Sequence, residues 1–193
     1  EGMLDLARSQ LGDTMDALSP HIDADVPVVG LEPSCIASFR DELPRLFPSD
    51  GRARYLAGNT FLLSEFLDRE DYQPPRRLSG PALVHPHCNH HGVMGTEAEA
   101  RVLGRTGLDF AFTDAGCCGM AGSFGFARDR YPVSLVIAED ALLPKVRAAG
   151  EDVLLLANGF SCREQIRQCT GRQALDLAQV LRMGLHDQPS AGH

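Results

Sequence analysis

Two hydrophobic periods alternate along the chain. Apolar residues at three- and four-residue spacing predict amphipathic helices, and short apolar runs between them predict buried strands. Helices are expected at 3–18, 36–46, 53–69, 93–104, 131–143, from 163 to about 168, and at 174–183. Strands are expected at 27–31, 82–85, 108–113 and 152–157. This order predicts an α/β fold, an open and mainly parallel sheet with flanking helices.

Prolines and polar stretches set the expected boundaries. Ser19-Pro20 should end the first helix, because the residue before a proline disfavours the helical conformation. Pro144 should begin a further turn or short helix. A polar linker at 71–81 divides residues 1–70 from residues 82–185. Residues 186–193 form a polar tail that is expected to be disordered.

Composition narrows the function without naming it. The 193 residues are 44% apolar and carry a net charge of −8, which argues against a basic nucleic-acid-binding surface. Nothing approaches the roughly 18 consecutive apolar residues of a membrane span, so none is expected. Glu1-Gly2-Met3 leads at once into helical periodicity, which predicts a piece of a longer polypeptide. The six cysteines are typical of metal binding or catalysis in a reducing compartment. We expect a cytoplasmic protein, with a peripheral position at the inner membrane left open.

The cysteines follow a common rule of position. Five of the six follow a predicted strand and precede a predicted helix, and they are Cys35, Cys88, Cys117 with Cys118, and Cys162. The carboxyl ends of parallel strands share one edge of a sheet, where such folds bind ligands. The sequence therefore predicts five thiols at one crevice, with Cys169 as a free thiol outside it.

The stretch Asp114–Gly125 carries the adjacent pair, Cys117 and Cys118. Adjacent side chains on a strand point to opposite faces, so both sulfurs can aim at one point only where the backbone leaves the strand. Gly116 and Gly119 are expected to allow this turn, because glycine accepts positive φ.

Five thiolates favour a soft metal, chiefly zinc or an iron–sulfur cluster. Structural zinc sites usually use C-x-x-C pairs, which this chain lacks, so the irregular set favours a multi-iron cluster. Of the histidines around Cys88, His87 and His90 are the candidate metal ligands or proton carriers.

Three motifs together resemble a known family. They are GCCGMAGSFG at 116–125, GFSCREQI at 159–166 and HPHCNH at 85–90. The first resembles the cysteine-rich CCG-domain family, which includes a subunit of heterodisulfide reductase and the iron–sulfur subunits of glycolate, lactate and glycerol-3-phosphate dehydrogenases. The other two are similar to the C-terminal region of large FAD-linked oxidases acting on D-2-hydroxy acids. LEPSC at 31–35 resembles the end of a first CCG repeat, and residues 82–183 resemble a nearly complete second one.

The resemblance implies a cluster of the 4Fe-4S type on Cys88, Cys117, Cys118 and Cys162, with Cys35 contributing from the neighbouring repeat. It implies FAD in the missing part of the polypeptide, that flavin domain as a partner, and a quinone or carrier as downstream electron acceptor. Two departures stand out. Gly159 replaces the first cysteine of the family's closing C-x-x-C, and the family's His-Cys-His triplet is His87-Cys88-Asn89 here.

The expected function is therefore electron transfer within an oxidoreductase that oxidises D-lactate, glycolate or D-2-hydroxyglutarate. The alternative is a structural zinc or interaction module without a redox role. A thiol–disulfide enzyme using Cys117 and Cys118 is disfavoured, because a vicinal disulfide is strained. A phosphate cradle at glycines 116–125 is also disfavoured, because no P-loop lysine accompanies it. The isolated fragment is expected to be inactive on substrate, and to lose its cluster or exchange it for zinc in air.

Overall fold

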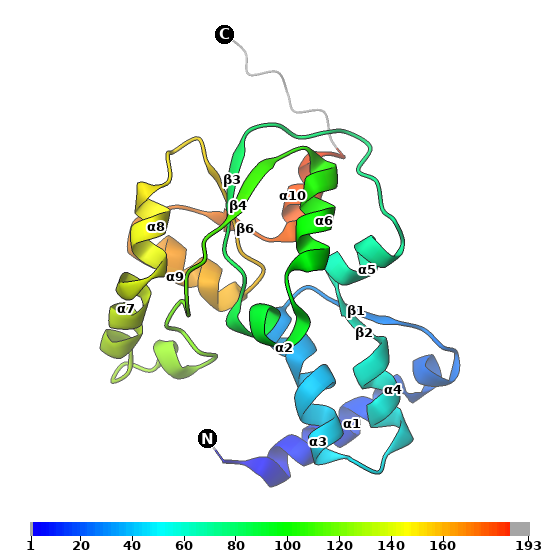
Figure 1. The fold of residues 1–193 in the computed structure, drawn as a ribbon. Coiled ribbons are helices and arrows are strands. Elements are labelled where there is room, and N and C mark those ends of the chain that lie inside the picture. The colour runs from blue at the N-terminus through cyan, green and yellow to red at the C-terminus, as the bar shows by residue number, and fades with distance from the viewer. Residues whose placement is uncertain (1, 186–193) are drawn as a thin grey trace.

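The computed structural model describes residues 2–185 and confirms the predicted α/β class, with parallel sheets flanked by helices (Figure 1). The strands are β1 (Val28–Gly30), β2 (Thr60–Leu62), β3 (Pro81–Val84), β4 (Asp109–Phe112), β5 (Leu154–Leu156) and β6 (Ala174–Leu175). The α-helices are α1 (Leu4–Asp23), α2 (Pro33–Ala37), α3 (Leu43–Leu46), α4 (Gly51–Asn59), α5 (Leu63–Arg69), α6 (Glu97–Thr106), α7 (Tyr131–Asp140), α8 (Leu142–Ala148), α9 (Phe160–Thr170) and α10 (Leu177–Met183). Two π-helical segments, η1 (Ser38–Glu42) and η2 (His90–Met94), and a 3₁₀ turn, η3 (Phe124–Phe126), complete this part of the chain.

The strands form two separate sheets. β1 and β2 pair in parallel, with Val28 opposite Thr60. The other sheet has the order β4-β3-β5-β6 and is parallel throughout, so Val84 at the end of β3 lies between Phe112 and Leu156. The carboxyl ends of β3, β4 and β5 therefore share one edge.

Helices cover both faces of the larger sheet. Figure 1 shows α7, α8 and α9 on one side and α6 and α10 on the other. Successive side chains of a strand alternate between faces, so Leu156 packs with Val84 beneath α6 and α10, whereas Leu155 packs on the α8 and α9 side. Cys118 and Cys162 belong to this second apolar cluster.

A smaller core holds the first helices together. Met15, Leu43, Ala53 and Leu56 are its buried members, and Ile22 packs against them. The expectation that α1 ends at Ser19-Pro20 is wrong, because the helix continues to Asp23. Packing of Ile22 outweighs the hydrogen bond that Pro20 cannot donate.

The continuous helix expected at 53–69 is also wrong. Strand β2 separates α4 from α5, because Thr60, Phe61 and Leu62 find a partner in β1. The Glu65 carboxylate accepts a hydrogen bond from the Leu62 backbone N–H at 2.8 Å and caps the start of α5.

Three further boundaries differ from expectation. The predicted helix at 93–104 is broken at Gly95, where φ is 80°, into η2 and α6. The helix at 131–143 stops at Asp140 and restarts as α8. Residues 174–175 extend the sheet as β6, and Asp176 caps α10 by accepting from the Gln179 N–H at 2.9 Å.

The expected disorder of residues 186–193 lies outside the described residues. Among the helices of residues 2–185, none combines the length and apolar character needed to cross a bilayer.

Candidate metal centre

Three neighbouring strand ends bring four cysteines together. Cys88 follows β3, Cys117 and Cys118 follow β4, and Cys162 lies in the first turn of α9 after β5. The four thiols interact electrostatically. The Cys118, Cys88 and Cys117 thiols all raise the pKa of Cys162, and the Cys117 and Cys118 thiols add to the effect of burial in raising that of Cys88. The carboxyl edge therefore gathers four of the five predicted thiols, whose role as ligands stays a prediction.

Cys118 and Cys162 form a buried hydrogen-bonded pair at the centre of this group. Their exposed fractions are 3% and 1%. The hydrogen bond from Cys162 lowers the pKa of Cys118 to about 7 against the effect of burial, with help from Met120 and Ser161. The same bond and burial raise the pKa of Cys162 well above its usual value. Near neutral pH Cys118 is therefore partly ionised, while Cys162 keeps its proton.

Of the two glycines expected to shape the double-cysteine loop, Gly116 and Gly119, only Gly119 takes a positive φ. Gly119 has φ 88°, and a Cβ there would overlap the carbonyl oxygen of Ser134 on α7, so no other residue fits. Its N–H donates to Cys117 Sγ at 3.3 Å. Gly116 does not take positive φ, so that expectation is wrong. Asp114 at φ 46° makes the turn out of β4 instead.

Two cations hold the strand ends that carry these loops. Lys145, the only lysine of the chain, donates from α8 to the carbonyls of Thr113 and Asp114. Arg163 donates from α9 to the carbonyls of Ala157 and Asn158, at 2.9 and 2.6 Å. Both side chains fix the backbone of loops that carry cysteines.

His87 lies beside the same corner. Its Nδ1 accepts from the Asn89 N–H at 3.1 Å and is 3.9 Å from Cys88 Sγ, so Nε2 is the nitrogen left for a metal or another partner. A Cβ at Gly159 would come 2.5 Å from His87 Cδ2 and 3.2 Å from Cys162 Sγ. The imidazole therefore fills the space that any side chain at position 159 would need.

His90 faces a carboxyl group instead of a thiol. Its Nδ1 is 3.5 Å from Glu99 Oε2, and both residues are essentially fully buried. Asn158 links Glu99 to α10, donating to Glu99 Oε1 at 2.6 Å and accepting from the Leu177 N–H at 2.9 Å. Burial lowers the pKa of His90 to about 4 and raises that of Glu99 to about 7, so the pair is neutral between these two pH values. Its metal role stays a prediction, and this network is absent from the sequence-based expectations.

Cys35 is set apart from the other thiols. It follows β1 of the two-stranded sheet, lies within α2, and is exposed. The expectation that all five cysteines share one sheet edge is therefore wrong for Cys35, because its strand pairs with β2 and not with β3. The start of this helix nevertheless reaches the site, since its N-cap residue Glu32 accepts from the Phe160 N–H at 2.8 Å.

A cavity of about 270 Å³ opens beside Cys88 and Cys117. Its lining is Pro86, Cys88, His91, Thr96, Phe112, Asp114, Ala115, Gly116 and Cys117. Within residues 2–185, no three His, Cys, Asp or Glu side chains already stand in the arrangement of a metal-ion site. The donor chemistry nevertheless fits a thiolate-bound group, because four thiols share one edge and one of them is partly ionised.

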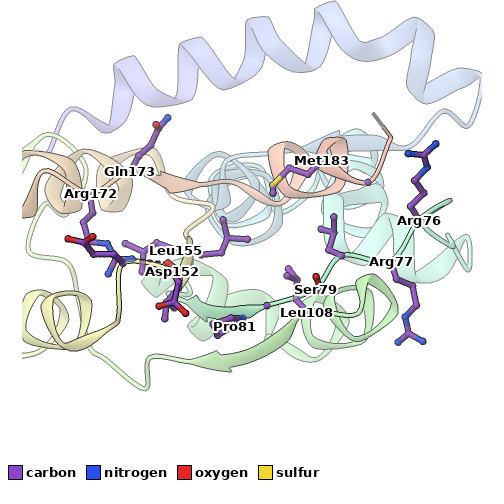
Figure 2. Close-up of a pocket in the computed structure, with 16 residues that line it drawn as sticks. Arg76, Arg77, Ser79, Pro81, Leu108, Asp152, Leu155, Arg172, Gln173 and Met183 are labelled. Atoms are coloured by element: carbon purple, nitrogen blue, oxygen red, sulfur yellow. Dashed lines mark hydrogen bonds between the residues drawn. The ribbon is translucent and has the colours of Figure 1, made fainter. Parts of the chain in front are cut away.

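A larger hollow of about 650 Å³ lies at the opposite, amino-terminal edge of β3 and β5 (Figure 2). Arg172 lines it, yet its guanidinium donates to the carbonyls of Val146, Ala149, Gly150 and Val153, at 2.7 to 3.0 Å. Asp152 and Glu151 add negative charge to the same wall. This hollow, which Arg76 and Arg77 also line, holds none of the cysteines, so the candidate thiol chemistry lies at the other edge.

No protein-family model matches the chain. It is 28% identical to D-2-hydroxyglutarate dehydrogenase of Pseudomonas putida over 78% of its own length and 14% of that protein. It is 29% identical to D-2-hydroxyglutarate dehydrogenase of Escherichia coli K12 over 94% of its length and 18% of that protein. It is also 28% identical to one subunit of the anaerobic glycerol-3-phosphate dehydrogenase of E. coli K12, over 88% of the chain and 43% of that protein. The chain thus spans between 14% and 43% of these relatives, all of which are dehydrogenases or parts of dehydrogenases by name.

Proposed function

We propose that the chain is the iron–sulfur electron-transfer segment of an FAD-linked oxidoreductase that oxidises a 2-hydroxy acid. The observation that carries the proposal is the meeting of Cys88, Cys117, Cys118 and Cys162 at the carboxyl edge of one parallel sheet. Thiolates from separate loops suit a cluster with several irons. The similarity to D-2-hydroxyglutarate dehydrogenases supports D-2-hydroxyglutarate as one substrate, beside D-lactate and glycolate.

The four cysteines would hold a 4Fe-4S cluster, which when bound supplies a one-electron carrier. Cys118 presents its sulfur partly ionised, and Cys162 would have to lose its proton to serve as a ligand. Lys145 and Arg163 keep the two loops in place through backbone carbonyls. Cys35 and His87 are further candidate ligands from the flanks of this group.

The rest of the reaction belongs to a larger assembly. We place hydride abstraction at FAD in a separate domain of the same polypeptide, and electron exit at a quinone or a carrier protein. Residues 1–70 would be the end of a first cysteine-rich repeat and residues 82–185 a second, joined by the linker at 71–81. The two separate sheets support this division.

Anaerobic expression with iron and acid-labile sulfide analysis tests the proposal. About four irons with matching sulfide per chain, together with a visible and EPR spectrum typical of a cluster, are expected for a 4Fe-4S protein. One zinc per chain without sulfide would overturn the proposal in favour of the structural module. Because oxygen destroys exposed clusters, the measurement is made before any contact with air.

The first testable prediction concerns Cys118→Ser. Serine lacks the soft sulfur ligand, so cluster content should fall to near zero while the circular dichroism of the folded chain is kept. Cys169→Ser is the matched control, since Cys169 lies near the end of α9, away from the cysteine edge, and its variant should keep full iron content. Undiminished iron and visible absorption in Cys118→Ser would show that the ligand assignment is wrong.

A further inference from the structure

One carboxylate from the two-stranded sheet reaches the cysteine edge of the other sheet. Glu32 follows β1, and its Oε2 accepts from the backbone N–H of Phe160, 128 positions along the chain, at 2.8 Å. The hydroxyl of Ser34 donates to the other oxygen, Oε1, at 2.9 Å. Both oxygens of this side chain are therefore engaged, and its orientation is fixed from both ends.

The hydrogen bond from Phe160 to Glu32 satisfies a backbone N–H group that has no partner within α9. The first N–H groups of a helix have no partner within the helix, and a side chain at the N-cap normally supplies one. The N-cap of α9 is Gly159, which has no side chain to do so. Glu32 takes over this role at the first residue of the helix, and its negative charge suits the positive end of the helix dipole.

The same carboxylate stands close to the candidate ligands. Cys162 lies two residues after Phe160, in the same helical turn, and Cys35 lies three residues after Glu32. Burial lowers the pKa of His87, and the negative charge of Glu32 acts in the opposite direction, which places the carboxylate within electrostatic reach of that imidazole.

We propose that Glu32 is a positioning residue that latches the start of α2, which carries Cys35, onto the first turn of α9 and sets the charge beside the cysteine site. The latch stands on the contacts described above. The charge effect rests on the proposed function, because it acts on a bound cluster: a nearby carboxylate disfavours the added electron and keeps the reduction potential low.

Two substitutions separate the two parts of the proposal. Glu32→Ala removes both the acceptor and the charge, whereas Glu32→Gln keeps an amide oxygen for the Phe160 N–H and removes only the charge. Glu42→Ala is the control, because Glu42 accepts from Ser38 within its own helical segment at 2.9 Å. Hydrogen–deuterium exchange of the Phe160 amide is measured on the metal-free protein, and the reduction potential on the iron-loaded protein.

In metal-free Glu32→Ala, the Phe160 amide should exchange faster by on the order of tenfold, since a charge-assisted hydrogen bond is lost. Glu32→Gln should restore part of the protection through its neutral amide oxygen, and Glu42→Ala should leave it at the wild-type level. Unchanged exchange in Glu32→Ala would overturn the latch, even if the protein binds iron normally.

In the iron-loaded protein, both Glu32 variants should show a more positive reduction potential than wild type and the Glu42 control. An unchanged reduction potential in Glu32→Gln would overturn the charge effect. The positioning role of Glu32 would then be decided by the exchange of the Phe160 amide alone. If wild-type protein takes up no iron and sulfide, the proposed function fails, while the exchange experiment still decides the latch.

Discussion

At the scale of single residues, Gly159 shows how packing and not backbone conformation can demand a glycine. Its φ is −69°, which any residue adopts, yet a Cβ there would lie 2.5 Å from His87 Cδ2. Gly159→Ala should therefore push the imidazole aside and lower the free energy of unfolding by about 1–3 kcal/mol, as overpacking does in other cores. Urea denaturation of the metal-free protein measures the change.

Gly104→Ala is the matched control for this substitution. Gly104 lies within α6, and a Cβ there meets nothing within 4 Å. Alanine should stabilise the helix by roughly 0.5–1 kcal/mol, because glycine loses more conformational freedom on folding. A destabilised Gly104→Ala, or an unaffected Gly159→Ala, would contradict the steric account.

The residues that the sequence could not single out are those whose partners are distant in the chain. The position of each cysteine after an apolar run was visible, because a run of that kind is local. Glu32 is an ordinary acidic residue until Phe160, 128 positions away, is placed beside it. Glu99 lies on a helix that is expected to be amphipathic, and only the fold turns it toward His90 and Asn158.

At the scale of elements, helix α1 continues past Pro20, and substituting this proline measures what its presence inside the helix costs in stability. Proline in a helix interior costs about 3 kcal/mol relative to alanine, and Pro20 is exposed within α1. Pro20→Ala should therefore raise the free energy of unfolding by about 1–3 kcal/mol. Part of the gain is offset, because proline also restricts the unfolded chain.

Pro144 provides the comparison for Pro20. It is exposed and lies in the first turn of α8, where a missing N–H costs nothing. Pro144→Ala should change the free energy of unfolding by less than about 0.5 kcal/mol. Equal effects of the two substitutions in thermal unfolding would mean that Pro20 does not strain α1.

The elements that sequence patterns predicted well are the long or strongly apolar ones. β3, β4 and β5 were expected close to their observed bounds, and they carry the cysteine edge. β2 and β6 have only 3 and 2 residues, too few to show a period of two, and a partner strand decides their conformation. Each was therefore absorbed into a neighbouring predicted helix.

At the scale of the whole molecule, the two sheets are joined by charged contacts as well as by Glu32. Asp68 on α5 pairs with Arg101 and Arg105 on α6, at 2.7 and 2.8 Å. Leu63 and Leu67 of α5 pack against the core of the larger sheet. Helix α5 follows β2 directly, so it couples the two-stranded sheet to the four-stranded one, and unfolding is expected to involve both.

The buried pair of His90 and Glu99 should make this global stability insensitive to pH over a defined window. Burial lowers the pKa of His90 from 6.5 to about 4 and raises that of Glu99 from 4.5 to about 7. Between pH 4.5 and 6.5 the folded pair holds one proton, on Glu99, and the unfolded pair also holds one, on His90. Equal proton counts leave the free energy of unfolding unchanged by this pair.

Substituting one residue of the pair should reveal how ionisation of the other makes the free energy of unfolding depend on pH. In Glu99→Gln, the unfolded state binds more protons at His90, so stability should rise by about 3 kcal/mol from pH 4 to 6.5. In His90→Gln, the folded state binds more protons at Glu99, so stability should fall as pH rises from 4.5 to 7. The other groups acting on His90, which include Glu65, His87 and His91, are the same in wild type and Glu99→Gln. Urea denaturation of metal-free protein across this range compares the three chains, and parallel profiles would contradict the pKa shifts that burial imposes on the two groups.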